Sequence, residues 1–334
     1  MRRRAATLLA TVGSLAVGCG GEKTNAPSAR DTSVVAVIKG LDNPFFGTMR
    51  DGLVATAERY QTPLRVEAAA DQSDAAGQAS RLDSQTTSHA GCYLVNPVNQ
   101  ANLIEPLSRL TPGTPIVNID SPVGQRQAAA VGVQITTYIG TDNAAAGAAA
   151  ANAMASIVAR GVRIAVLTGT PGDATSAARI DGFRRGAAGR FRVVASAAAD
   201  FDRRRAELAT EELLSTDRRL AGVFAANDLM ALGAATAVRA AGRRGEVAVI
   251  GVDGIREALT AIRRGSLSAT VAQYPYTIGQ LGVQACLAAT RAKKVPARID
   301  APIQVVTSAN VARAEANFPE PIEAFENPLA ALLS

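Results

Sequence analysis

The sequence is poor in aromatic side chains and in histidine. It contains no tryptophan, and aromatic residues make up 4% of its 334 residues. His89 is the single histidine. With a single histidine, the usual histidine-based catalytic triads and zinc sites are nearly excluded. We interpret His89, at a predicted helix end, as a solvated or capping residue.

Cysteine is also rare, with only Cys19, Cys92 and Cys286 present. None of the three has the spacing of a metal-binding motif. Cys92 lies in the apolar run GCYLV and Cys286 in the helical stretch VQACLAATRA. Apolar surroundings are typical of buried free thiols, which we predict for both. A Cys92–Cys286 disulfide is the less favoured alternative for an exported protein. We expect no metal and no cofactor.

The charge distribution does not indicate a nucleic-acid partner. The net charge is +6, but the basic residues are scattered along the chain and no aromatic-interleaved basic stripe is present. The one dense basic run, Arg203–Arg205, is predicted to be the exposed start of a helix. A polyanion-binding protein would concentrate its basic residues on one surface.

The N-terminus has the pattern of an export signal. A charged Met1–Arg4 precedes the apolar stretch Ala5–Val17, which is too short to span a membrane permanently. Cys19 follows Ala16-Val17-Gly18, which resembles a bacterial lipoprotein signal except that Ala16 stands where leucine is usual. We predict a signal peptide over 1–18, lipidation of Cys19 and a flexible polar tether over 19–31.

The remaining chain alternates short apolar runs with helical patterns. Nine runs are predicted strands: 34–39, 64–68, 91–95, 115–119, 163–168, 193–197, 222–226, 247–252 and 268–273. Asn43 and Pro44 are predicted to begin a helix whose buried stripe includes Phe46 and Met49. Alternation of this kind predicts an α/β fold of parallel sheets with helices on both faces. Because the units are too many for one comfortable sheet, we expect two lobes, with a first crossing near 139–141 and a helix over 144–159 beginning the second lobe.

Polar side chains follow six of the apolar runs. Because ligands bind outside the carboxyl ends of parallel strands, these residues predict a site between the lobes. They are Lys39, Asn96, Asp120, Asn227, Asp253 and Gln273. For Asn43, Asn96, Asn227 or Asp253 taken alone, helix capping or a turn explains the residue equally well.

The chemistry of this set favours recognition of a polyol. Carboxylates, amides and cations form directional hydrogen bonds with hydroxyl groups, and aromatic rings pack against the C–H face of a sugar. Phe45 lies off the helix stripe and is freer than Phe46 to face the cleft. The set contains no activated nucleophile with its base, and 169–176 (GTPGDATS) lacks the Gly-Lys of a phosphate-binding loop.

These motifs resemble the ribose-type periplasmic sugar-binding proteins, the sugar-binding components of ABC importers. The resemblance runs from about Thr32 to Ala312. It is carried by LDNPFF (41–46), VNPVNQANL (95–103), IDSP (119–122), IGTDNAAAG (139–147), TSAARIDGF (175–183), ADFDRRRA (199–206), FAANDLMALGA (224–234), VIGVDG (249–254) and ATVAQYPYTIG (269–279).

The resemblance implies a type I periplasmic-binding-protein fold with three crossings between the lobes. It assigns Arg179 as the ligand-binding arginine and Phe201 as the stacking aromatic. It further implies walls made of Asn43, Phe45, Phe46, Asp120, Asn227, Asp253 and Gln273. Asn96 aligns as well.

Three positions depart from the ribose-type pattern. Lys39 replaces a small hydroxyl residue, Ser121 replaces an arginine, and Val252 replaces an aromatic residue. A lysine at the first strand end is similar to arabinose- and autoinducer-binding relatives. We include Lys39 and Ser121 among the predicted ligand-binding residues, and the ligand stays open among another pentose, a hexose, a polyol and an anionic sugar.

We therefore predict a lipid-anchored, extracytoplasmic, monomeric binding protein that delivers a sugar or polyol to an ABC permease. The alternatives are a receptor for a sugar acid or autoinducer-type furanose that feeds a chemoreceptor or sensor kinase, a secreted sugar-active enzyme using Asp120 and Asp253, and a repressor with the same two-lobe core. The predicted division is a first lobe of 32–140 plus 274–304, a second lobe of 141–273 plus 305–313, and an extension over 314–334.

Overall fold

A computed structural model describes residues 31–333 of the chain. The predicted signal peptide, the lipidation site Cys19 and the tether before Asp31 lie outside the described residues. None of the helices between residues 31 and 333 combines the length and the apolar character that a membrane crossing needs.

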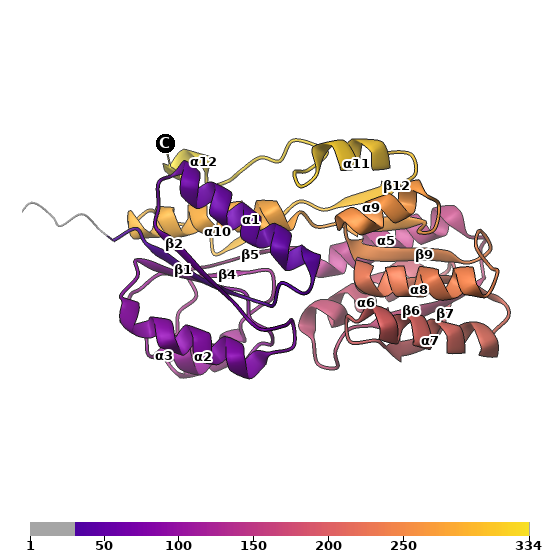
Figure 1. Cartoon of the computed structure of the whole chain (residues 1–334), viewed down its shortest axis with the longest axis horizontal. Helices are drawn as coiled ribbons and strands as arrows, with labels where there is room; N and C mark the ends of the chain where they lie inside the picture. Colours follow the sequence, from indigo (N-terminus) through magenta and orange to yellow (C-terminus); the bar gives the residue numbers. More distant parts are fainter. Residues whose placement is uncertain (1–30, 334) are drawn as a thin grey trace, which may run out of the picture. The chain divides into compact units, whose positions relative to one another are not determined.

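The described chain forms two α/β lobes, each built on a six-stranded sheet (Figure 1). The first lobe has the strand order β11-β5-β4-β3-β1-β2, and every pairing in it is parallel. Its strands are β1 (Val34–Ile38), β2 (Leu64–Ala68), β3 (Cys92–Val95), β4 (Ile116–Ile119), β5 (Thr137–Gly140) and β11 (Arg298–Asp300).

The second lobe has the strand order β12-β10-β9-β8-β6-β7. Its pairings are parallel except for β10 with β12, which is antiparallel. Its strands are β6 (Arg163–Thr168), β7 (Arg192–Ala198), β8 (Leu220–Ala225), β9 (Ala248–Asp253), β10 (Ala269–Ala272) and β12 (Gln304–Thr307). The prediction of two parallel-sheet lobes is confirmed.

Helices cover both faces of the first sheet because alternate strand residues point to opposite sides. Val34, Ala36 and Ile38 pack in a core with the first and last helices of the lobe, whereas Val35 and Val37 pack in a separate core on the other face. The helices are α1 (Pro44–Arg59), α2 (Ala75–Gln85), the 3₁₀ turn η1 (Thr86–Ser88), α3 (Ile104–Ser108), α4 (Gln125–Ala130) and α10 (Pro275–Thr290).

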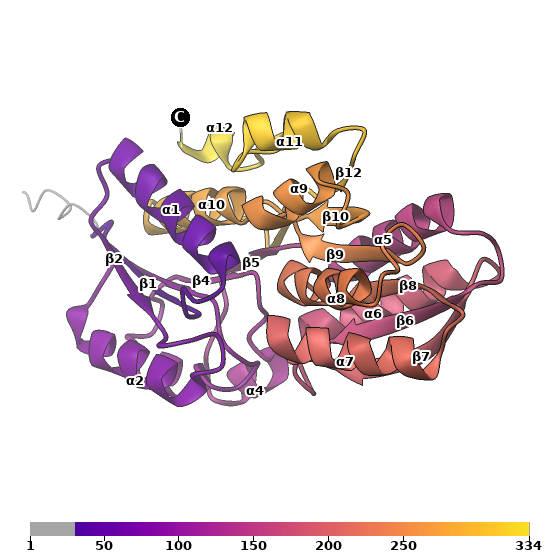
Figure 2. The ribbon, with the colours of Figure 1, turned by 45° about the vertical axis from the view of Figure 1, so that its right-hand side comes forward.

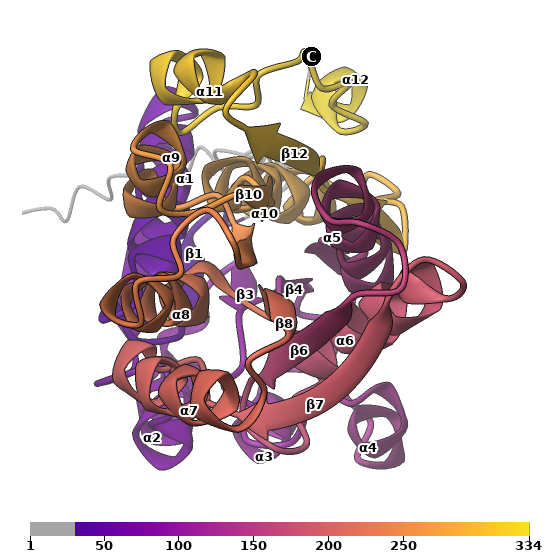
Figure 3. The ribbon, with the colours of Figure 1, turned by 90° about the vertical axis from the view of Figure 1, so that its right-hand side faces the viewer.

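The second sheet is likewise covered on two sides (Figure 3). The pair α5 and α6 packs on one face, and α7, α8 and α9 pack on the other. The helices are α5 (Asn143–Ile157), α6 (Ala174–Ala187), α7 (Arg203–Thr216), α8 (Asp228–Ala240), α9 (Arg256–Arg263) and α11 (Val311–Asn317). The predicted helix over 144–159 is thus confirmed as α5, and the basic run Arg203–Arg205 begins α7 as predicted.

The chain crosses between the sheets three times, as predicted. The crossings lie between β5 and β6, between β10 and β11, and between β11 and β12. After α11, the chain returns over α10 and ends near the short helix α12 (Ala330–Leu333), as Figures 1 and 2 both show. This terminal segment, residues 315–333, therefore contacts helices of both lobes.

Three strands were not predicted from the sequence: β5, β11 and β12. Each has only three or four residues, and β5 (TYIG) begins with Thr137, directly after Thr136, and contains no long apolar run. β11 and β12 are edge strands, and edge strands need no continuous apolar sequence because one side is not paired. Pairing across the sheet therefore determines these strands more than their own residues do.

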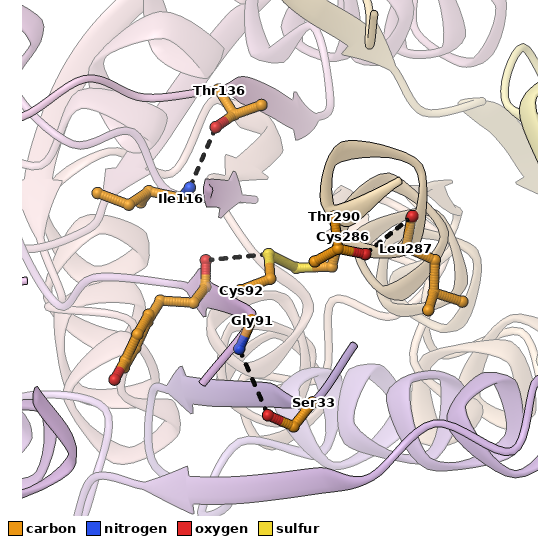
Figure 4. The surroundings of a disulfide bond; sticks show 9 residues. Ser33, Gly91, Cys92, Ile116, Thr136, Cys286, Leu287 and Thr290 are labelled. Atoms are coloured by element: carbon orange, nitrogen blue, oxygen red, sulfur yellow. Dashed lines mark hydrogen bonds between the residues drawn. A yellow bond between two sulfur atoms is a disulfide. The ribbon is translucent and has the colours of Figure 1, made fainter. Parts of the chain in front are cut away.

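The prediction of free thiols at Cys92 and Cys286 was wrong, because the two residues form a disulfide bond (Figure 4). Cys92 begins β3, and Cys286 lies on the face of α10 that packs against the first sheet. Their Cα atoms are 5.6 Å apart, although 194 positions separate them in the sequence. Apolar neighbours showed that both cysteines are buried, but not that they are buried side by side.

Candidate ligand-binding cleft

A cavity of about 40 Å³ lies where the carboxyl ends of strands from both lobes meet. Residues of the first lobe form one wall, and residues of the second lobe form the other. The lining residues are Lys39, Asn43, Phe45, Phe46, Gln72, Asp120, Ser121, Thr175, Arg179, Phe201, Asn227 and Asp253.

The Asn-Pro-Phe-Phe segment serves as a helix start and as part of the cavity wall. The Asn43 side chain caps α1 by accepting a hydrogen bond from the Phe45 amide at 3.0 Å, and Pro44 is the first helical residue. The rings of Phe45 and Phe46 meet edge to face with centroids 5.3 Å apart. Both phenylalanines are buried, so the same ring surfaces serve the core and the cavity.

Asp120 is held in place by three neighbouring side chains, those of Asn96, Ser121 and Tyr138. One of its carboxylate oxygens, Oδ2, accepts hydrogen bonds from Asn96 Nδ2 at 2.9 Å and from Ser121 Oγ at 3.1 Å. The Tyr138 hydroxyl donates to the Asp120 carbonyl at 2.5 Å. Burial, and then the charge of Asp120, raise the pKa of Tyr138, so that hydroxyl stays protonated as a donor. The second carboxylate oxygen of Asp120 is left to accept from a ligand.

Arg179 joins three parts of the second wall. Its Nε donates to Asn143 Oδ1 at 2.8 Å, its Nη1 to the Ala226 carbonyl at 2.6 Å, and its Nη2 to Gln273 Oε1 at 3.0 Å. Its Nη1 also lies 3.5 Å from Asp253 Oδ1. A planar guanidinium with donors in fixed directions can hold all these partners at once, which a lysine cannot do.

Asp253 and Asp228 form a buried acidic pair at the end of β9. Burial raises the pKa of Asp253 well above its usual range, although Arg179 acts in the opposite direction. Burial also raises the pKa of Asp228 to about 6. Asp228 does not line the cavity. Instead it accepts hydrogen bonds from the amides of Gly254 and Ile255 and from the Thr270 hydroxyl, which fixes the turn that carries Asp253.

Unusual backbone conformations gather at this cleft. Of the eight non-glycine residues with positive φ in the described chain, Asp120, Phe201 and Asp253 line the cavity, and Asp200 and Tyr274 lie close to strand ends in the sequence. Such conformations cost free energy and persist where the surrounding structure enforces them, commonly at ligand sites. The strained backbone positions therefore lie at the same ends of the strands as the cavity.

Phe201 reaches the cavity because Gly169 lacks a side chain. A Cβ atom at Gly169 would lie 2.2 Å from the Phe201 ring, so the ring rests directly on the backbone after β6. The Gly169 amide donates to Ser176 Oγ at 2.8 Å, which ties this backbone to the start of α6. Gly169 thus determines where the Phe201 ring lies.

The structure brings together ten of the eleven predicted ligand-binding residues. Gln273 is the exception: it is fully buried behind the wall, where its amide bridges Arg179 and Asp253. Asn96 is also behind the wall. Gln72 and Thr175 line the cavity but were not predicted, because Gln72 lies in a loop and Thr175 in the first turn of α6, away from any strand end.

A larger cavity of about 310 Å³ adjoins the first. Lys39, Gln72, Ser121, Thr175 and Phe201 line both cavities, so these residues form the boundary between them. The outer cavity is otherwise lined by small and polar residues of both lobes. Among residues 31–333, no group of three or more His, Cys, Asp or Glu side chains is placed to hold a metal ion.

Comparison with known proteins agrees with this architecture. The sequence profile of the periplasmic binding protein domain matches residues 34–294. The chain belongs to this family. It is 33% identical over 288 residues to the ribose import binding protein of Haemophilus influenzae, covering 85% of this chain and 94% of that protein. It is 31% identical over 278 residues to the D-allose-binding periplasmic protein of Escherichia coli, and this match covers 81% of this chain and 88% of that protein.

A solved structure shows the same fold. The periplasmic solute-binding protein of an ABC transporter from Actinobacillus succinogenes, with bound D-allose, superposes with a TM-score of 0.80 at 26% identity, covering 84% of this chain and 99% of that one. The predicted resemblance to ribose-type periplasmic binding proteins is confirmed. The relatives are binding proteins of transport systems, so the prediction of a binding protein and not an enzyme is confirmed as well.

Proposed function

We propose that this periplasmic binding protein captures a monosaccharide or related polyol in the cleft between its lobes and delivers it to an ABC permease. One observation carries the proposal. A single cavity combines hydrogen-bonding groups from both lobes with the rings of Phe45, Phe46 and Phe201. Polar groups in fixed directions suit hydroxyls, and rings suit the C–H face of a sugar. Relatives that bind ribose and allose support the same assignment.

Binding would require the lobes to move apart and close again. The inner cavity of about 40 Å³ holds only a few water-sized groups. A sugar ring is larger, so it would enter while the lobes are separated and be enclosed when they close by hinge motion at the three crossings. We propose that the lobes are divided there, with residues 32–140 and 274–304 moving against 141–273 and 305–313.

The binding experiment uses titration calorimetry of the purified protein with pentoses, hexoses, polyols and sugar acids. We expect at least one to bind. Asp120→Ala should weaken its binding by about 10-fold or more, because hydrogen bonds to a charged partner contribute about 1.5–3 kcal/mol. Asp181→Ala is the matched control, since Asp181 is an exposed carboxylate on the helix that carries Arg179. Absence of binding by every member of the panel would contradict the proposed function.

We also propose that the protein is anchored outside the cytoplasm by a lipid on Cys19. The family acts in extracytoplasmic transport, and the N-terminal sequence supports the lipid. Cells that express the full chain would be fed a labelled fatty acid. Label should appear in the wild-type protein and be absent from Cys19→Ala, which should remain soluble after export. An unlabelled wild-type chain would exclude the anchor.

A further inference from the structure

Two cations line the cleft, Lys39 and Arg179, and only Arg179 has a hydrogen-bond or ion-pair partner for its charged group among residues 31–333. Arg179 is engaged by Asn143, Ala226, Gln273 and Asp253. The ammonium group of Lys39 makes no hydrogen bond and no ion pair with any residue in 31–333. Its nearest aromatic contact is the Phe46 ring, whose centroid lies 5.4 Å from Nζ.

This lysine is not a surface residue. Only 7% of Lys39 is exposed, and it lines both the inner and the outer cavity. An ammonium at a largely buried residue loses part of its hydration, and without a counter-charge that loss is costly, so buried lysines are paired in most proteins. A contact of this length between a cation and a ring compensates only part of that cost.

Within residues 31–333, none of the nearby carboxylates forms an ion pair with Lys39. Asp253 is held by Gln273 and Arg179, and its raised pKa favours the neutral form. Asp120 accepts from Asn96 and Ser121 and does not lie within ion-pair distance of Lys39. In the outer cavity, Asp173 accepts from the start of α6 and Asp200 pairs with Arg205.

From this geometry we infer that the ligand carries an anionic group, a carboxylate or a phosphate, which binds the Lys39 ammonium at the boundary between the two cavities. The inference rests on the proposed function and narrows it to an anionic monosaccharide. Asp120 and Asn227 are then available to form hydrogen bonds with the hydroxyl groups of the ligand, and the phenylalanine rings to pack against the C–H face of the sugar. Lys39 makes the site specific for an anion because its positive charge is compensated by an anionic ligand and stays uncompensated when a neutral sugar binds.

The test compares matched neutral and anionic ligands by titration calorimetry. The pairs are D-galactose with D-galacturonate and D-ribose with D-ribonate, and D-ribose 5-phosphate separates phosphate from carboxylate recognition. We expect an anionic member to bind about 10-fold or more tightly than its neutral counterpart. In Lys39→Met, which keeps the length of the side chain, that anion should bind about 30-fold more weakly, a larger loss than its neutral counterpart shows in the same variant.

A second measurement does not depend on choosing the right ligand. Without ligand at pH 7, Lys39→Met should melt at a higher temperature than the wild type, because it removes an unpaired buried charge. Lys293→Met, at an exposed lysine, is the control and should leave the melting temperature unchanged.

The outcomes separate the two proposals. A neutral sugar that binds as tightly as its acid would overturn the inference and leave the proposed function intact. If no member of either class binds, the proposed function fails. A Lys39→Met protein no more stable than the wild type would overturn the assignment of Lys39 as an unpaired cation, whatever the ligand.

Discussion

Asp228 does not line the cavity, but its hydrogen bonds hold the turn that carries Asp253. Its two carboxylate oxygens bind Gly254, Ile255 and Thr270, and a Cβ atom at Gly251 would lie 2.2 Å from Asp228 Oδ1. The glycine therefore makes room for the carboxylate, and the carboxylate fixes the turn at Asp253. We regard Asp228 as a positioning residue for the second wall.

The pKa of Asp228 predicts a pH dependence of stability. Because burial raises this pKa from 3.8 to about 6, the folded protein binds a proton that the unfolded chain releases. The contribution to the free energy of unfolding is complete below pH 3.8 and is lost as the pH rises through 6. Asp253, whose pKa is also raised, acts in the same direction.

Urea unfolding at several pH values checks this prediction against Asp228→Asn, which keeps the shape but does not titrate. The wild type should gain stability relative to the variant as the pH falls from about 7 to about 4. Asp228→Ala should be less stable than the wild type by about 1–3 kcal/mol near pH 7, because buried donors lose their acceptor, and the deficit should grow as the pH falls. A wild-type-to-Asn difference that stays constant with pH would show that Asp228 does not titrate in this range.

The sequence located most of the cavity wall because strand ends carry a local signal. A polar residue directly after an apolar run identified Lys39, Asp120 and Asp253. No such signal marks Asp228, whose role depends on a turn 26 positions away in the sequence. No local pattern shows that Gln273 is buried behind the cavity wall, whereas the other strand-end residues Lys39, Asp120 and Asp253 line the cavity.

Between helices, close packing depends on glycine. Gly279 of α10 lies against the backbone of α1: a Cβ atom there would be 2.3 Å from the Met49 carbonyl oxygen and 2.9 Å from the Leu53 nitrogen. The two helices are the outer layer over one face of the first sheet. Their spacing positions the start of α1, where Asn43 and the two phenylalanines enter the cavity wall.

Replacing this glycine should destabilise the first lobe. Gly279→Ala should lower the free energy of unfolding by about 1–3 kcal/mol, because backbone cannot move aside as a flexible side chain can. Gly47→Ala, on α1, is the matched control: apart from the adjoining backbone of α1 and its two chain neighbours, no atom lies within 4 Å of the position that the added methyl group would occupy. It should raise stability by about 0.5–1 kcal/mol through helix propensity. Chemical denaturation of both variants measures the contrast, and equal effects would refute the close contact.

The strands illustrate what a pattern can and cannot predict. Central strands such as β1 and β9 are buried on both faces, so their residues are continuously apolar and easily recognised. β11 and β12 depend on partners from distant parts of the chain. The disulfide is the same kind of feature, since its formation depends on the packing of α10 against β3 and not on either local sequence.

Across the two lobes, the terminal segment 315–333 forms a connection in addition to the three crossings. On the second lobe, Arg256 lies over the Phe318 ring at 4.3 Å and Arg263 pairs with Glu315 at 3.2 Å. On the first, Gln284 accepts from Asn327 at 2.7 Å, and Leu329 is fully buried. A segment attached to both lobes should limit how far they separate.

Shortening the chain tests this connection. Deleting residues 319–334 should lower the melting temperature and increase the radius of gyration measured by X-ray scattering without ligand. Leu329→Ala should cost about 2–5 kcal/mol, whereas Glu326→Ala, at an exposed position, should have little effect. A truncated protein with unchanged stability and dimensions would show that the segment places no restraint on the lobes.

The disulfide between Cys92 and Cys286 has a further consequence for the covalent structure. Nearly the whole second lobe, from β6 to β10, lies between these two residues in the sequence. A protease that cuts an exposed turn of that lobe, such as the one around Gly242 and Gly245, therefore opens a closed ring of chain and does not release a fragment. The nicked molecule remains a single covalent species until it meets a reductant, and both walls of the cleft stay covalently joined.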